Sequence, residues 1–138
     1  MSAVVTRAAV SFGVDEPLKI VDVELPELGP HDVRVKMAAV GVCHSDLSML
    51  NGTLQPRFPV IPGHEASGIV AELGAAVTAV GVGQHVVLNW APPCRRCWYC
   101  LHAEPWLCTQ VEGVVSTPWG RLGGEQVYGL FSVGAFAE

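Results

Sequence analysis

Short hydrophobic runs rich in valine recur along the chain and are separated by glycine, proline or aspartate. Runs of this length, bounded by turn-forming residues, are typical of β-strands. The predicted strands are residues 3–10, 18–25, 33–42, 68–73 and 85–89. The segments 26–30 and 77–83 hold the proline and glycine residues that end strand pairing. The pattern therefore predicts a mainly β protein, built as a barrel with loops.

Residues 43–50 are the exception, because their hydrophobic positions follow a helical spacing. Asp46 supplies an early polar residue, Leu47 and Leu50 share one face, and Asn51-Gly52 supplies a stop. We expect one short helix here. After residue 109 repeated glycines weaken the pattern, and one further strand is expected near 126–131. Residues 135–138 resemble the opening of another strand, so we expect the chain to be part of a longer protein.

Composition narrows the class of protein. A chain of 138 residues suits one domain and can bury a core without disulfides. The net charge is −5, and the eight Lys and Arg residues are dispersed, which argues against a nucleic-acid partner. No apolar run reaches the roughly 18 residues of a membrane span, and no signal-like stretch opens the chain. We expect a cytoplasmic protein that does not associate with membranes.

Four of the five cysteines form the pattern C-x2-C-x2-C-x7-C, made by Cys94, Cys97, Cys100 and Cys108. Two-residue spacers allow neighbouring sulfurs to point at one ion, and the longer seven-residue loop brings the fourth sulfur back to the same ion. Four thiolates close the coordination shell, so the predicted role is a structural zinc site. An iron–sulfur cluster or two disulfides are the alternatives.

The fifth cysteine, Cys43, precedes His64 by twenty-one positions, and Glu65 follows directly. Thiolate and imidazole are common ligands of catalytic zinc. Spacing alone does not establish such a site, because a single cysteine and a single histidine are more often buried structural residues.

Taken together, these motifs resemble the zinc-dependent medium-chain alcohol dehydrogenases. The resemblance rests on the segment Pro59-Val-Ile-Pro-Gly-His-Glu-Ala-Ser-Gly68, on Gly81-Val-Gly-Gln-His-Val86 and on the four cysteines, and it covers essentially the whole chain. It implies that residues 1–138 form a GroES-like β-barrel with short helices and a four-cysteine zinc lobe. This would be the catalytic domain of the enzyme, without its Rossmann cofactor domain.

The resemblance also implies roles for the residues around Cys43. Cys43 and His64 match two ligands of a catalytic zinc, and Glu65 matches a carboxylate that can approach the ion. Asp46 matches the residue that accepts a hydrogen bond from the ligand histidine; a solvated aspartate at a helix start is the alternative. The third protein ligand of the family is a cysteine for which this chain offers no candidate.

Further matches concern the proton and the substrate. Ser45 matches the hydroxyl that passes on the alcohol proton, although serine is also common at helix starts. Ser48 stands where many relatives carry the histidine of the proton relay. His44 matches a position near the cofactor pyrophosphate, and it is also a candidate to receive the proton. Leu54 and Trp90 match positions that line the substrate cleft, with core packing as the alternative.

The implied function is oxidation of an alcohol to an aldehyde or ketone, with hydride transfer to NAD or NADP. The sequence has no G-x-G-x-x-G fingerprint, so the cofactor is expected to bind mainly outside this chain, which alone would be inactive. The full-length protein is expected to be a homo-oligomer acting on a small alcohol or aldehyde. The alternative class is a free-standing, zinc-stabilised GroES-like binding module, in which Cys43 and His64 are simply buried.

Overall fold

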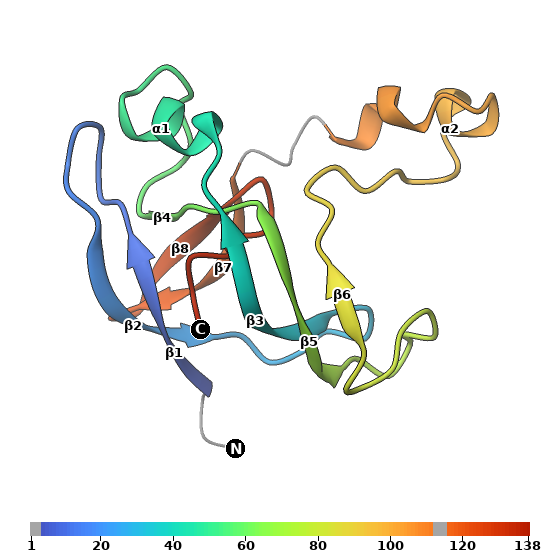
Figure 1. Cartoon of the computed structure of the whole chain (residues 1–138), viewed down its shortest axis with the longest axis horizontal. Helices are drawn as coiled ribbons and strands as arrows, with labels where there is room; N and C mark the ends of the chain where they lie inside the picture. Colours follow the sequence, from blue (N-terminus) through green and yellow to red (C-terminus); the bar gives the residue numbers. More distant parts are fainter. Residues whose placement is uncertain (1–3, 112–115) are drawn as a thin grey trace.

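A computed structural model of the chain describes residues 4–111 and 116–138 (Figure 1). The described strands are β1 (Val4–Val10), β2 (Lys19–Leu25), β3 (Val33–Gly41), β4 (Val60–Ile61), β5 (Glu65–Leu73), β6 (His85–Val87), β7 (Ser116–Leu122) and β8 (Glu125–Leu130). The helical elements are α1 (His44–Leu50), α2 (Trp98–Leu101) and the 3-10 turns η1 (Pro105–Leu107) and η2 (Thr109–Val111). Within the described ranges, no helix is long and apolar enough to cross a membrane.

The strands form two sheets that face each other as a partly open barrel (Figure 1). The first sheet has the order β1-β2-β7-β8-β4, and the second has the order β3-β5-β6. All pairs are antiparallel except β4 with β8. The segment with α2 and η1 stands apart from both sheets, and α1 follows directly after β3 (Figure 1). The chain therefore has a barrel and a separate cysteine-bearing lobe.

Alternation of side chains along the strands builds the core. In β1 the residues at positions 6, 8 and 10 are buried while their neighbours face outward, as the two-residue period of a strand requires. One buried cluster consists of Ala8, Val10, Val23, Ile61 and Val127. A second cluster, Met49 with Val60 and Leu130, connects α1 to the first sheet. This second cluster fixes the helix that begins directly after Cys43.

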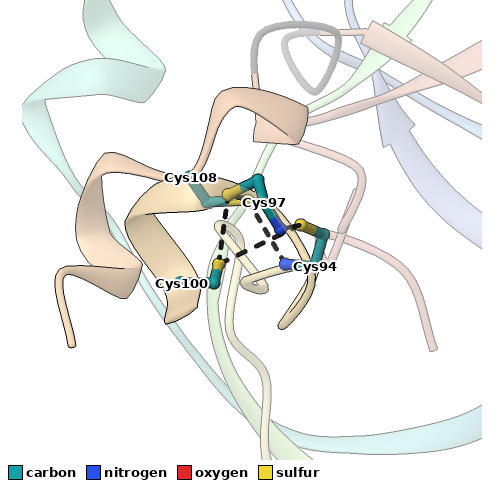
Figure 2. A group of neighbouring side chains, drawn as sticks. All are labelled: Cys94, Cys97, Cys100 and Cys108. Atoms are coloured by element: carbon teal, nitrogen blue, oxygen red, sulfur yellow. Dashed lines mark hydrogen bonds between the residues drawn. The ribbon is translucent and has the colours of Figure 1, made fainter. Parts of the chain in front are cut away.

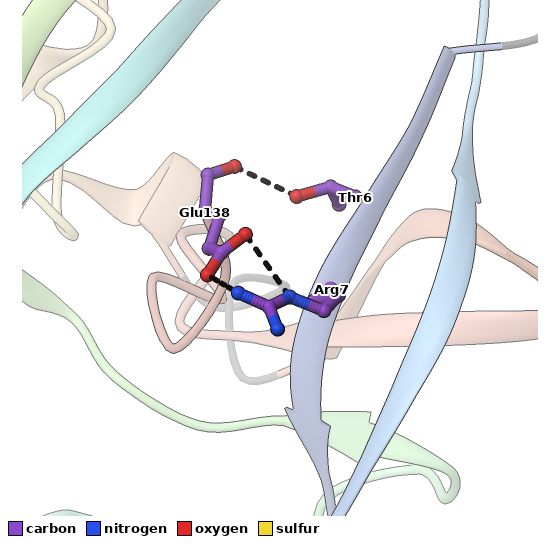
Figure 3. Close-up of polar contacts among 3 residues, drawn as sticks. All are labelled: Thr6, Arg7 and Glu138. Carbon is purple, nitrogen blue, oxygen red and sulfur yellow. Dashed lines mark hydrogen bonds and ion pairs between the residues drawn. The ribbon is translucent and has the colours of Figure 1, made fainter.

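The last residues of the chain run beside β1. Ala137 forms an isolated bridge with Ala8, and the Thr6 hydroxyl donates to the Glu138 carbonyl at 2.7 Å. The Arg7 guanidinium forms a two-pronged contact with the Glu138 carboxylate (Figure 3). This contact raises the pKa of Arg7 and lowers the pKa of Glu138. Because both side chains are exposed, the ion pair adds little stability.

All five strands predicted in the first ninety residues are present, with shifted ends. Residue 3 lies outside the described residues, β5 begins at Glu65, before the predicted start, and β6 ends at Val87. The helix predicted at 43–50 is confirmed as α1, for which Cys43 is the N-cap. The strand expected at 126–131 ends at Leu130, and the one expected at 135–138 is a single bridge.

Two strands were missed by the sequence pattern. Strand β4 has only two residues, and β7 contains Pro118 and Gly120, which normally disfavour a strand. The ladder between β7 and β8 is irregular between Pro118 and Gly120, so the proline is accommodated at a bulge. A Cβ atom at Gly120 would lie 2.6 Å from the Glu24 carbonyl oxygen, so glycine lets β7 approach β2.

Truncation of the fully buried Ile61 to alanine should lower the free energy of unfolding by about 2–5 kcal/mol, because it removes apolar contacts and leaves a cavity. The matched control is Ile20→Ala, since Ile20 is 69% exposed. It should cost less than about 1 kcal/mol. Urea denaturation of the zinc-loaded chain measures both values. Equal losses in the two variants would contradict the placement of the core.

Candidate metal centres

The four cysteines of the lobe converge on one point (Figure 2). Their sulfur atoms all lie within 4.8 Å of one another. Cys97 Sγ is 3.4 Å from Cys100 Sγ and 4.0 Å from Cys108 Sγ. The separation between Cys94 Sγ and Cys100 Sγ is also 4.0 Å. Helix α2 and the turn η1 supply the local backbone that brings these side chains together.

These distances suit a single tetrahedral ion. Metal–sulfur bonds of about 2.3 Å in tetrahedral geometry place the sulfurs about 3.8 Å apart. All five cysteines are free thiols in the structure, so the two-disulfide alternative is not adopted. In a cluster of several irons, the cysteines ligate different iron atoms and lie further apart. The lobe therefore has the donor set and the spacing for one thiophilic ion.

The thiols of the lobe differ in acidity. Backbone N–H groups of Cys100 and then of Thr109 lower the pKa of the Cys97 thiol to about 6. Partial burial, and then the hydrogen bond with Cys97, raises the pKa of the Cys100 thiol to about 12. The backbone N–H of Arg96 contributes most to a lowered pKa at Cys94. Four adjacent thiolates repel one another, and a bound cation would relieve that repulsion.

A second group of donors lies at the barrel, where three sequence-predicted residues meet. One ligand atom each from Cys43, His64 and Glu65 lies within 4.8 Å of the others. Cys43 precedes α1, Glu65 opens β5, and His64 stands immediately before it. The exposed fraction of His64 is only 4%, whereas Glu65 is exposed. The group is therefore buried on one side and open on the other.

Asp46 connects the two chain segments that carry these donors. Its Oδ2 accepts a hydrogen bond from the Cys43 backbone N–H at 3.0 Å. Its Oδ1 accepts one from the Gly63 backbone N–H at 2.8 Å. The carboxylate is 3% exposed, and the Gly63 bond is fully buried. Asp46 thus holds the residue before α1 and the residue before His64 at fixed positions, and Gly63 is a contributor that the sequence did not reveal.

The His64 ring is the most direct indication that this group suits a metal. Its Nδ1 atom lies 3.5 Å from Asp46 Oδ1 and has no hydrogen-bond partner among the described residues. A buried ring nitrogen without a partner is costly. With a metal on Nε2, the proton resides on Nδ1 and faces the carboxylate, which is the usual arrangement around a ligand histidine. The residues present therefore fit a metal ion.

Two aromatic rings lie close to the His64 ring. The Trp90 ring lies edge-on to His64 at a centroid distance of 6.4 Å, and the Phe131 ring lies edge-on at 4.8 Å. Trp90 and Phe131 are themselves 4.9 Å apart. Phe131 was expected to end the strand predicted at 126–131, but its backbone φ of 50° places it in a turn after β8, and nothing in the sequence indicated that its ring contacts His64.

An open depression of about 470 Å³ lies beside this group and includes His64, Glu65 and Trp90 in its lining. The predicted cleft residue Leu54 is half-buried in the loop after α1, where its backbone N–H donates to the Ser48 carbonyl at 2.8 Å. A larger depression of about 650 Å³ lies along β1 and β3 and contains none of the predicted site residues.

The polar residues of α1 also lie near the donor group. Ser45 Oγ is 3.7 Å from Cys43 Sγ. Ser48 Oγ is 3.3 Å from His44 Nδ1, one turn earlier on the helix. His44 is exposed, and Ser45 is half-buried. The helix therefore presents one hydroxyl beside the thiol ligand and an imidazole–hydroxyl pair at its surface.

Comparison with known proteins agrees with this architecture. Residues 29–138 match the model of the alcohol dehydrogenase GroES-like domain, and the chain belongs to this family. The resemblance inferred from the sequence and the GroES-like barrel are thereby confirmed. The chain is 40% identical to a putative alcohol dehydrogenase D of Mycobacterium tuberculosis over 96% of its own length. That match spans 38% of the relative, so the chain is much shorter than its curated relatives.

Solved structures show the same fold. An alcohol dehydrogenase zinc-binding domain protein from Burkholderia ambifaria superposes with a TM-score of 0.87 at 26% identity, over 99% of this chain and 39% of that one. A CAD from Helicobacter pylori, complexed with NADP(H), gives a TM-score of 0.67 at 30% identity, over 78% of this chain and 32% of that one.

Replacement of Asp46 by asparagine should lower the free energy of unfolding by about 1–3 kcal/mol. The amide would turn one –NH₂ group toward a backbone N–H that now donates to the carboxylate, and that donor would be left unpaired. The control is Asp32→Asn, because the exposed Asp32 carboxylate accepts from the Gly29 N–H and an amide oxygen can replace that contact. Urea denaturation measures the free energy of unfolding of both variants. Equal values would contradict the role of Asp46 in joining the two chain segments.

Proposed function

We propose that this chain forms the metal-binding catalytic domain of a zinc-dependent alcohol dehydrogenase. The observation that carries the proposal is the convergence of Cys43, His64 and Glu65 on one point, beside a depression that His64 and Glu65 help to line. A thiolate, an imidazole and a carboxylate are all ligands that zinc accepts. Membership in the alcohol dehydrogenase family supports zinc as the ion for both donor groups.

The two donor groups suggest two different uses of zinc. The lobe supplies four sulfurs, which complete a tetrahedral shell and leave no position for a substrate. We assign it a structural role. The group at the barrel supplies three donors, and its exposed side offers an open position. We assign it the catalytic role, because catalytic zinc typically keeps one position free.

The residues around the open group would act on the alcohol. When bound there, zinc supplies positive charge that eases loss of the hydroxyl proton. Ser45, beside the Cys43 sulfur, is placed to accept that proton in a hydrogen bond. The Asp46 carboxylate, 3.5 Å from His64 Nδ1, would accept a hydrogen bond from the ring when that nitrogen carries the proton, and would leave Nε2 for the ion. His64 and Cys43 would thereby stay fixed while the substrate changes charge.

The proton then needs a route to solvent. Ser48 cannot act as a base near neutral pH, but its hydroxyl contacts the exposed His44 imidazole. We assign His44 as the acceptor, since a neutral imidazole has a ring nitrogen that can accept a proton and the ring lies at the protein surface. Its exposure at the start of α1 also leaves it accessible to a cofactor phosphate, the other role that the family resemblance implies.

Trp90 and Phe131 would form the apolar wall against the substrate. Their rings lie 4.9 Å apart, and both face the His64 ring. Leu54 is the further proposed cleft residue. Apolar and aromatic lining excludes water from the substrate and orients its carbon skeleton. Small alcohols and aldehydes are accordingly the proposed substrate class.

The proposed acceptor of the hydride is a nicotinamide cofactor, NAD or NADP. The structure of the Helicobacter pylori relative in complex with NADP(H) supports this choice. We propose that the cofactor binds mainly to sequence beyond these 138 residues, since the described chain is built of β-sheets and short helices. Nucleotide binding of this kind uses alternating strands and helices around a glycine-rich turn.

The alternative function, a binding module with zinc only in the lobe, has less support. It requires Cys43 and His64 to be ordinary buried residues, whereas their side chains converge with Glu65. It also leaves the buried Nδ1 atom of His64 unexplained.

In the full-length protein supplied with zinc and NAD or NADP, Ser45→Ala should lower kcat for alcohol oxidation by about a hundredfold or more, because it removes the proton acceptor beside Cys43. Zinc content should stay unchanged. The control is Thr53→Ala, which deletes a hydroxyl at an exposed position after α1. Coupled reduction of the nicotinamide measures both. Equal activity of the two variants would refute the role of Ser45. A full-length wild type that oxidises none of the alcohols offered as substrates would refute the proposed function.

A further inference from the structure

Gly41 lies directly opposite Glu65 in the ladder between β3 and β5. A Cβ atom at Gly41 would lie 2.8 Å from Glu65 Oε2 and 3.2 Å from Glu65 Cβ. The Glu65 carboxylate therefore occupies the space that any larger residue at position 41 would need. The backbone of Gly41 is not in the left-handed region, so its conformation does not itself require glycine.

The ladder places the two donor segments side by side. Gly41 ends β3 two residues before Cys43, and Glu65 begins β5 one residue after His64. A Glu65 side chain that lies across Gly41 keeps its carboxylate within 4.8 Å of the Cys43 and His64 ligand atoms. Glu65 is otherwise exposed, and its carboxylate has no ion pair among those the described residues form.

We propose that Gly41 is a positioning residue, whose missing side chain lets the Glu65 carboxylate fold across β3 and reach the metal held by Cys43 and His64. The inference rests on the open metal site of the proposed function. It adds that the position of this carboxylate is set by the residue opposite it in the sheet.

The expected result of Gly41→Ala follows from the two contact distances. The nearest atom is the far end of a flexible side chain, so the carboxylate can rotate away while the β3–β5 ladder stays paired. Loss of this donor should weaken metal binding by about tenfold or more. Glu65→Ala should weaken binding to the same extent, because it removes the same oxygen atoms.

The test uses the 138-residue chain with one equivalent of zinc, which the four thiolates of the lobe bind most tightly. Cobalt(II) is then titrated, and its visible absorption reports affinity for the open site. The wild type is compared with Gly41→Ala, with Glu65→Ala and with the double variant. The matched control is Gly81→Ala, since a Cβ atom there meets only Gln84 Cδ, at 3.8 Å. Circular dichroism confirms that each variant is folded.

We expect both single variants to bind cobalt about tenfold more weakly, the double variant to bind no more weakly than either, and the control to match the wild type. Wild-type affinity in Gly41→Ala would overturn this inference and leave the metal site intact. Additive losses in the double variant, or an unfolded Gly41→Ala chain, would also overturn it. A wild type that binds no cobalt would overturn the open metal site itself, and with it the proposed function.

Discussion

The buried carboxylate of Asp46 is the constraint on which the proposed open metal site depends. It accepts one hydrogen bond from the Cys43 backbone and one from the Gly63 backbone, so a single side chain joins the start of α1 to the segment before β5. A buried carboxylate is tolerated only when its oxygens are satisfied, and both are. The same group faces Nδ1 of His64. Without it, only the β3–β5 ladder would join the segment that carries Cys43 to the segment that carries His64.

The two candidate metal-binding groups are built in different ways. In the lobe, four sulfurs on one short stretch of chain surround a point, and little of the barrel is involved. At the open site the donors come from two distant segments, which the β3–β5 ladder and Asp46 bring together. Local construction suits an ion that stabilises a loop, since binding energy there is folding energy. Construction on a rigid sheet suits an ion that must hold its geometry while a substrate exchanges.

The sequence predicted the elements whose signals are local. Valine-rich runs gave five strands, and the cysteine spacing indicated the lobe. Strand β7 was missed because Pro118 and Gly120 obscure its pattern, and their acceptability depends on a bulge and on the nearby Glu24 carbonyl. Phe131 and Gly41 were not predicted as site residues, because the sequence does not show which residues lie opposite them in the fold. Their importance comes from the rings and carboxylate opposite them in space, which spacing along a chain does not record.

We propose that this chain carries two metal sites, one closed and one open. Zinc per chain, measured by elemental analysis before and after mild chelation, tests it most directly. We expect about two zinc ions in the loaded chain and about one after chelation. The four thiolates of the lobe should release their ion less readily than the three mixed donors of the open site. Cys97→Ser should lose the retained zinc, and Cys43→Ser only the exchangeable one. One zinc that never depends on Cys43 would contradict the open site, and zinc in none of the samples would contradict both.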